Sequence, residues 1–185
     1  MPTRLETLPE IEAAVWNQLS VAVGEKAHEW RSPVLATVNG DAADARTVVL
    51  REVAERQKQL LFYTDERAGK VSQLLSHPHG TVVMWSRKLG WQLRCHVRLT
   101  LEMSGLSASS RWARIKLTRA AQEYLSAMPP GTPLADVHHA GSGEVPRDYF
   151  AVISAEIEVI DWLELHAGGN RRAIFDARGP RWIQP

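Results

Sequence analysis

The side chains best suited to binding chemistry in this sequence are concentrated between Arg46 and Lys70. Arginines lie at both ends of the block RTVVLR, from Arg46 to Arg51, and Thr64 ends the later block LLFYT. Lys70 follows in the first turn of an expected helix, where unpaired amides and the helix dipole favour an anion. Arginine and lysine can close around such an anion. The stretch therefore predicts a phosphate site.

A second interpretation of these residues stays open. Arg46 and Arg51 would be rim charges of a sheet, Asp65 only an N-cap, and Lys70 a solvated side chain. The two arginines are five residues apart, so strict alternation along a strand puts them on opposite faces. Both reach one phosphate only if a bulge or a strand end reorients one of them.

The elements that position these residues are predicted as strand, turn, strand and helix. The blocks 46–51 and 60–64 are β-branched and aromatic, whereas the charged segment 52–59 does not suit a sheet interior, which predicts a hairpin. A helix with Val71, Leu74 and Leu75 on its apolar side follows and ends before Pro78.

Alternating apolar residues predict the rest of a sheet. The additional strands are expected at 33–39, 80–86, 91–102 and 149–160. The first should pair with 46–51 across the turn Asn39 to Asp41. On strand 91–102, Gln92 shares a polar face with Arg94, His96 and Arg98.

Helices are expected to flank this sheet. The N-terminal segment 1–30 contains a helix that begins at the capping box Thr7 to Glu10 and stops near Gly24. The segment 107–128 is predicted to be helical, and 129–147, rich in Gly, Pro and His, is predicted to be a loop and a mobile lid. We expect a single domain over 1–185, mainly β with flanking helices (α+β).

Composition excludes several classes of function. The 22 basic and 21 acidic residues give a net charge of +1, which does not predict nucleic acid or an anionic membrane as a partner. No apolar run approaches the ~18 residues of a membrane span, and the N-terminus lacks a signal-peptide core, so a cytoplasmic location is expected. Cys95 is the single cysteine, and His138 and His139 are interpreted as loop residues, so no metal is expected.

Four ordered blocks resemble the pyridoxamine 5′-phosphate oxidase family of FMN-binding split β-barrels. They are RTVVLR at 46–51, FYTD at 62–65 with Lys70, WQLR at 91–94, and Trp162 ten residues before Arg172, and the closing WIQP is also similar. The resemblance implies an antiparallel split barrel with FMN as cofactor. It also implies a homodimer, because in the family two subunits complete each site.

The resemblance further implies which residues contact FMN. The phosphate would be bound by Arg46, Arg51, Thr64 and Lys70, with Val49 and Leu50 in the same block. The ring and ribityl region would be contacted by Tyr63, Gln92, Trp162 and Arg172, with Trp162 reaching in from the neighbouring subunit. No catalytic residue is assigned, because redox chemistry belongs to the isoalloxazine.

One segment departs from the family. The true oxidases carry Arg-Pro-Arg followed by Ser-Gln to grip the substrate, where this chain reads SSRWARIKLTRAAQEYL, and Ala68 stands where relatives have a serine. We therefore expect an FMN-dependent oxidoreductase acting on an unidentified small molecule. The alternative is a barrel that binds flavin or haem as a carrier or sensor without turnover, and a third interpretation is an RNA-binding barrel.

Overall fold

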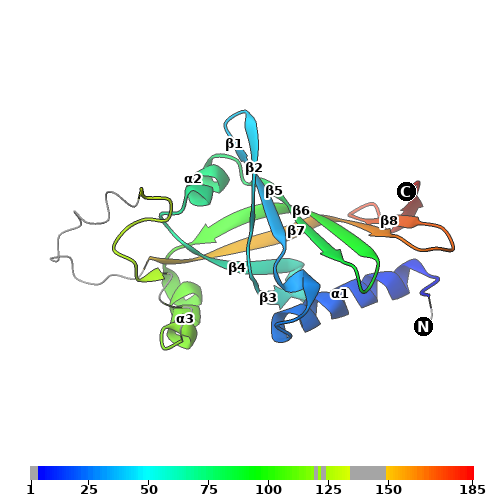
Figure 1. The fold of residues 1–185 in the computed structure, drawn as a ribbon, viewed down its shortest axis with the longest axis horizontal. Helices are drawn as coiled ribbons and strands as arrows, with labels where there is room; N and C mark the ends of the chain where they lie inside the picture. Colours follow the sequence, from blue (N-terminus) through cyan, green and yellow to red (C-terminus); the bar gives the residue numbers. More distant parts are fainter. Residues whose placement is uncertain (1–3, 119–120, 122–123, 134–148) are drawn as a thin grey trace.

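The computed structural model of the protein describes residues 4–118, 121, 124–133 and 149–185, and these form an antiparallel sheet with three α-helices (Figure 1). The helices are α1 (Leu8–Gly24), α2 (Gly69–Ser76) and α3 (Gly105–Ile115). The strands are β1 (Val34–Asn39), β2 (Ala42–Thr47), β3 (Leu50–Ala54), β4 (Gln59–Asp65), β5 (His79–Ser86), β6 (Trp91–Glu102), β7 (Phe150–Glu164), β8 (Arg171–Phe175) and β9 (Arg181–Ile183). Two short 3₁₀ helices are η1 (Glu29–Arg31) and η2 (Glu55–Gln57).

The sheet is curled, and its two edges are joined by a very short connection. Its strand order is β2-β1-β5-β6-β7-β4-β3, with β8 and β9 continuing from β7. Strands β2 and β3 lie at opposite ends of this order, yet only Val48 and Val49 separate them in sequence. The sheet must therefore bend until its edges meet, without pairing along that seam, and this is the split barrel.

The split between β2 and β3 corrects the expected single strand over 46–51. Residues 42–47 pair with β1, whereas 50–54 pair with β4. The β3–β4 register shifts between Leu50 and Glu52, which makes Arg51 the extra residue of a bulge. Arg46 and Arg51 are expected to share a phosphate only if a bulge or a strand end reorients one of them, and a bulge is present at Arg51.

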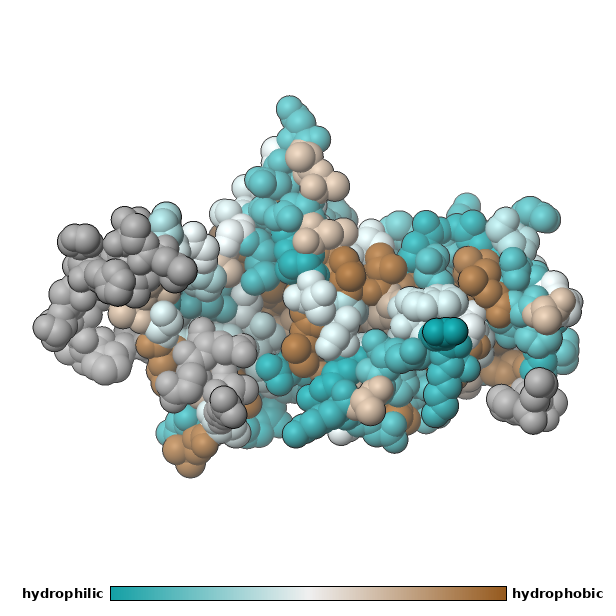
Figure 2. Space-filling view, in the orientation of Figure 1, coloured by the Kyte–Doolittle hydropathy of each residue, from teal (hydrophilic) through white to brown (hydrophobic). Residues whose placement is uncertain are grey.

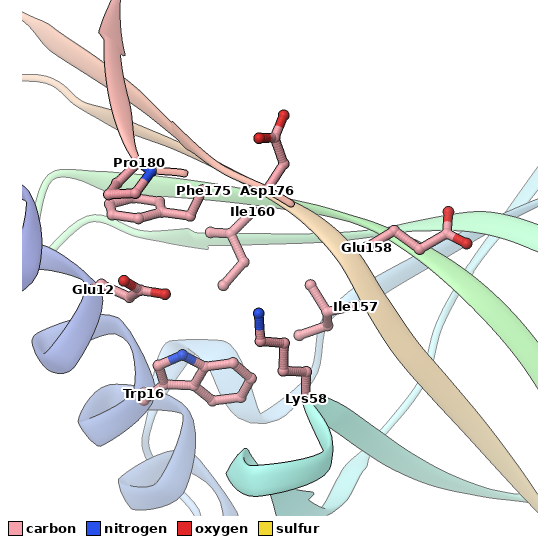
Figure 3. A pocket seen from close by; sticks show the side chains of 9 residues that line it. All are labelled: Glu12, Trp16, Lys58, Ile157, Glu158, Ile160, Phe175, Asp176 and Pro180. Carbon is pink, nitrogen blue, oxygen red and sulfur yellow. The ribbon is translucent and has the colours of Figure 1, made fainter. Parts of the chain in front are cut away.

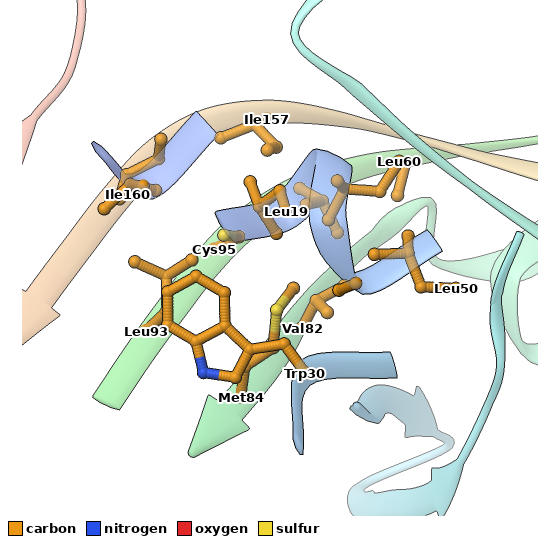
Figure 4. Packing of buried hydrophobic residues seen from close by; sticks show 14 of the residues in the cluster. Leu19, Trp30, Leu50, Leu60, Val82, Met84, Leu93, Cys95, Ile157 and Ile160 are labelled. Carbon is orange, nitrogen blue, oxygen red and sulfur yellow. The ribbon is translucent and has the colours of Figure 1, made fainter. Parts of the chain in front are cut away.

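Helix α1 covers the concave face of the sheet. Its buried stripe includes Ile11, Val15 and Leu19, and the predicted capping box at Thr7 and Glu10 is present. Figure 4 shows Leu19 among Leu60, Cys95 and other core side chains from the strands. The visible outer side of α1 is mainly hydrophilic in Figure 2, as expected for an amphipathic helix. No helix among the described residues has the length and hydropathy to cross a membrane.

The predicted helix over 107–128 is too long. Helix α3 ends at Ile115, and its N-cap is Ser104 and not Ser107. Leu117, the next apolar residue, is 90% exposed, so no packing extends the helix past that point. Residues 119–120, 122–123 and most of the predicted lid, 134–147, lie outside the described residues.

Candidate functional site

Lys70 is a half-buried cation at the start of α2. Its Nζ donates a hydrogen bond to Thr64 Oγ1 at 3.1 Å, and Thr64, near the end of β4, is buried. Within the described parts of the chain, Lys70 forms no ion pair with a carboxylate. Burial lowers the pKa of Lys70, the Arg46 guanidinium lowers it further, and Asp65 opposes both effects.

The amino end of α2 has no side-chain cap. Its N-cap residue is Ala68, and the first turn contains no acidic residue. Asp65 does not cap the helix, as the second interpretation required, because its carboxylate accepts hydrogen bonds from Arg67 N, Nε and Nη2. Val71 N donates to Ala68 O at 2.8 Å, which leaves the amides of Gly69 and Lys70 for solvent or an external anion.

Arg46 lies on β2 with a side chain that is only 19% exposed. Its Nη1 donates to Leu35 O at 3.2 Å and Thr37 Oγ1 at 2.6 Å, and its Nη2 donates to Asp44 Oδ2 at 2.6 Å and Gln73 Oε1 at 2.7 Å. These four bonds use every Nη hydrogen and leave the Nε donor. Arg46 is thus held rigidly near Lys70 with one donor for another group.

Together these groups have the chemistry of a phosphate cradle. They supply an ammonium, a buried hydroxyl, one guanidinium donor and uncapped helix amides, all of which favour a compact dianion. The structure thus brings three of the predicted phosphate residues, Arg46, Thr64 and Lys70, to one place.

Arg51 and Tyr63 lie elsewhere, on the α3 side of β4. Successive residues of a strand face opposite ways, so Tyr63 points away from the side that Thr64 shares with Lys70. The Arg51 Cζ lies 5.7 Å from the centroid of the Tyr63 ring, and the Tyr63 hydroxyl donates to Glu52 Oε1 at 2.7 Å. Burial first, and then Glu52, raises the pKa of Tyr63 to about 12. Arg111 of α3 also binds Glu52, which ties α3 to this edge.

Val49 and Leu50 lie at the seam between these two groups. Leu50 is fully buried in the core, and Val49 is half-buried. Their side chains add no polar group to the cradle.

The predicted ring contacts lie on β6, β7 and β8. Gln92 pairs with Leu163, which pairs with Arg172, so the three side chains form a row on the convex face. Arg172 donates to both oxygens of Asp161, at 2.9 and 2.8 Å. Burial alone would raise the pKa of Asp161, but hydrogen bonds from Arg172 and Arg94 outweigh it and lower the pKa.

Trp162 lies on the opposite, concave face of the same strands. It is fully buried, and its ring makes edge contacts with Trp91 at 5.4 Å and Trp182 at 6.3 Å between centroids. Figure 1 shows α2 and β8 well apart along the sheet, so one chain does not bring the ring contacts to the cradle.

Three cavities lie outside both groups. One of about 550 Å³ lies between α1, η1 and the β5–β6 turn, and another of about 540 Å³ lies between α1 and η2. The third, about 40 Å³, is enclosed by Trp16, Lys58 and Phe175 among others (Figure 3). None of the three contains a residue predicted to contact a cofactor.

Sequence reasoning missed the residues that hold Arg46, which are Thr37, Asp44 and Gln73. Gln73 lies one helical turn after Lys70, so it faces the same side of α2. Its partners lie 29 and 36 positions away in sequence. No local pattern contains these contacts, which become visible only when the register of β1 and β2 is known.

Residues 13–102 match the family described as pyridoxamine 5′-phosphate oxidase, FMN-binding domain. No curated protein matches the chain.

Solved structures share the fold at low sequence identity. A pyridoxamine 5′-phosphate oxidase-related, FMN-binding protein from Nostoc punctiforme aligns over 98% of this chain and 98% of its own, with a TM-score of 0.72 and 22% identity. PhzG from Burkholderia lata, in complex with tetrahydrophenazine-1-carboxylic acid, aligns over 96% of this chain and 92% of its own, with a TM-score of 0.73 and 15% identity. General Stress Protein 26 from Bacillus anthracis aligns over 80% of this chain and 92% of its own, with a TM-score of 0.53 and 13% identity.

Proposed function

Because residues 13–102 belong to the pyridoxamine 5′-phosphate oxidase family of FMN-binding domains, we propose that this chain is an FMN-dependent oxidoreductase acting on a small molecule. One observation carries the proposal. Lys70 is a half-buried cation without a carboxylate partner among the described residues, and it lies beside Thr64 at an uncapped helix end. A buried charge without a partner is costly, so a bound anion is the natural compensation.

The cradle residues fit the terminal phosphate of FMN. Lys70, Thr64 and the first amides of α2 would bind it directly, and Arg46 would add its Nε donor. Bound FMN supplies the redox chemistry of its ring. The contribution of the chain is to bind the phosphate, orient the cofactor and keep water from the buried part of the site.

The ring end of the site requires a second copy of the chain. We propose a homodimer in which Gln92 and Arg172 of one protomer face the cradle of its partner. The convex sheet face that carries them also exposes large apolar side chains, with Val34 38% and Trp85 45% exposed. Burying such side chains favours association.

Trp162 has an indirect place in this proposal. It is fully buried, and Trp182 lies against it. Trp162 lies on the sheet face opposite Gln92 and Arg172, so its role in the proposal is structural. It supports β8, because Ala173 pairs with it next to Arg172.

The proposal is tested in two steps. First, the purified protein is denatured and the released chromophore is identified by mass, where FMN is expected and haem or no chromophore contradicts the proposal. Second, the flavin absorbance is followed after anaerobic addition of NADPH and then after admission of air. Bleaching and recovery support an oxidoreductase, whereas flavin that stays oxidised with NADPH and other reductants supports a carrier or sensor.

A further inference from the structure

We infer that Thr37 and Gln73 are positioning residues of the phosphate cradle, because they fix the guanidinium of Arg46 beside Lys70. Thr37 comes from β1, Arg46 from β2 and Gln73 from α2, so three elements meet in one hydrogen-bond network. The inference rests on the proposed FMN site and assigns residues that only support it.

The donor and acceptor groups of these side chains allow only one arrangement of hydrogen bonds. Arg46 can only donate, so Thr37 Oγ1 and Gln73 Oε1 must accept its Nη hydrogens. The Thr37 hydroxyl then has its own proton for Gln73 Oε1, at 2.6 Å. The remaining amide nitrogen of Gln73 donates to Asp44 Oδ2 at 2.8 Å, because a carboxylate can only accept.

The burial of these groups makes the network rigid. Thr37 is 3% exposed and the Arg46 side chain 19%, so a lost bond is not readily replaced by water. Asp44 is different, because its side chain is 44% exposed. Without Thr37 and Gln73, Arg46 would keep a surface ion pair with Asp44 and a hydrogen bond to Leu35 O. Its guanidinium would then be free to turn toward solvent.

This predicts a defect in cofactor binding that leaves Lys70 in place. The guanidinium of Arg46 would no longer be held near Lys70, although Lys70, Thr64 and the amides of α2 are unchanged. The loss should therefore be partial, about tenfold in the Kd for FMN, as for one hydrogen bond to a charged group.

The decisive comparison is Thr37→Val against Thr37→Ser. Valine has the shape of threonine without the hydroxyl, whereas serine keeps it. Apoprotein is titrated with FMN by flavin fluorescence, and each apoprotein is checked by thermal unfolding. We expect about tenfold weaker binding for Thr37→Val and a change of less than about twofold for Thr37→Ser. Equal affinity of both variants and wild type, or equal loss in both, overturns the inference.

Gln73→Met is the second variant, and it tests the inference independently if a Thr37 variant does not fold. Methionine fills a similar volume without either hydrogen-bonding group, and we again expect about tenfold weaker binding. Ser76→Ala, at an exposed position of the same helix, is the matched control and should bind FMN as wild type does. Wild-type affinity in Gln73→Met overturns the inference.

The pH dependence separates positioning from general damage to the hairpin. The groups that act on Lys70 are Arg46 and Asp65, and Arg46 lowers its pKa. If Arg46 turns away in Thr37→Val, Lys70 keeps its proton to higher pH, and FMN release on raising the pH shifts upward. Weaker binding with an unshifted pH profile contradicts positioning. Wild-type protein that binds no FMN would instead refute the proposed function.

Discussion

The two ends of the sheet differ in whether every partly buried cation has a carboxylate partner. At the β7–β8 end, Arg94 and Arg172 bind Asp161, and Arg4 and Arg171 bind Glu164. At the α2 end, Lys70 has a hydroxyl partner and no carboxylate among the described residues. Lys70 is thus the exception at the α2 end, because Arg46 and Arg67 near it are paired with Asp44 and Asp65.

The comparison has energetic consequences. Removing one partner of a buried ion pair leaves a charge without compensation, which costs about 3–5 kcal/mol. Removing Lys70, a half-buried cation without a carboxylate partner among the described residues, leaves no other charge uncompensated in the fold. It does remove the attraction for an anionic ligand. Substitutions at the two ends should therefore separate stability from binding.

The largest expected effect is on stability, from Asp161→Ala. The Asp161 side chain is 4% exposed and accepts hydrogen bonds from Arg94 and Arg172. We expect a loss of about 2–4 kcal/mol in the free energy of unfolding, measured by urea denaturation, because the arginines left behind are 38% and 27% exposed and water partly solvates them. The control is Glu158→Ala, whose side chain is 44% exposed and 3.5 Å from Arg98, and which should cost less than about 0.5 kcal/mol. Similar losses in both variants would contradict the comparison.

The next effect is on binding, from Lys70→Ala. We expect FMN affinity to fall by about 2–3 kcal/mol, or roughly 30- to 150-fold, because a charge-assisted contact with the phosphate is lost. Apoprotein stability should not fall, because a partly desolvated cation is removed. Lys26→Ala, at an exposed site, is the control. Combining Lys70→Ala with Arg46→Ala should abolish flavin binding with the fold intact, and retained flavin would place the phosphate elsewhere.

A third expectation concerns pH. The pKa of Lys70 is lowered in the folded protein, so FMN affinity should fall as the pH rises through that lowered value, below the ordinary lysine range. In the same interval the unfolded chain holds more protons than the folded apoprotein. The contribution of Lys70 to apoprotein stability should therefore rise with pH. FMN affinity and apoprotein stability are each measured against pH in wild type and in Lys70→Ala, and the difference between the two proteins isolates the effect of Lys70. If the two differences change with pH in the same direction, the expectation is wrong.

The smallest effect is expected on the α3 side of β4. Tyr63→Phe removes one hydrogen bond to Glu52, which keeps Arg111 and Arg114 as partners. We expect a loss of about 0.5–1.5 kcal/mol in the free energy of unfolding. A loss as large as that of Asp161→Ala would show that this edge also depends on a buried ion network.

The family and the antiparallel barrel are predicted correctly from the sequence alone, whereas the assignment of the cradle to a phosphate stays a prediction. Thr64 and Lys70 are six residues apart at the end of a strand and the start of a helix, so local pattern is enough to bring them together. The FMN family, the antiparallel barrel and α1 follow from similarly local signals. The assignments of Gln92, Trp162 and Arg172 to the flavin ring stay predictions, because one chain does not bring them to the cradle.

Other features depend on contacts that no local pattern contains. The apolar run at 46–51 looks continuous, yet the chain crosses there from one sheet edge to the other. Residues 107–128 are compatible with one helix, but α3 ends at Ile115, because the exposed Leu117 gives it no packing beyond that point. Arg46 contacts Thr37, Asp44 and Gln73 only because of the β1–β2 register and the packing of α2 against β1.

The two-residue crossing at Val48 and Val49 sets the tolerance of the barrel to insertion. From Thr47 to Leu50 the chain makes three residue steps, which reach at most about 11 Å, so this link behaves as a short tether between the sheet edges. Extra residues in the β1–β2 turn lengthen an exposed hairpin tip, whereas extra residues in the tether let the edges drift apart. Arg46 and Arg51 stand on either side of that tether, so their separation is fixed by chain length as well as by packing.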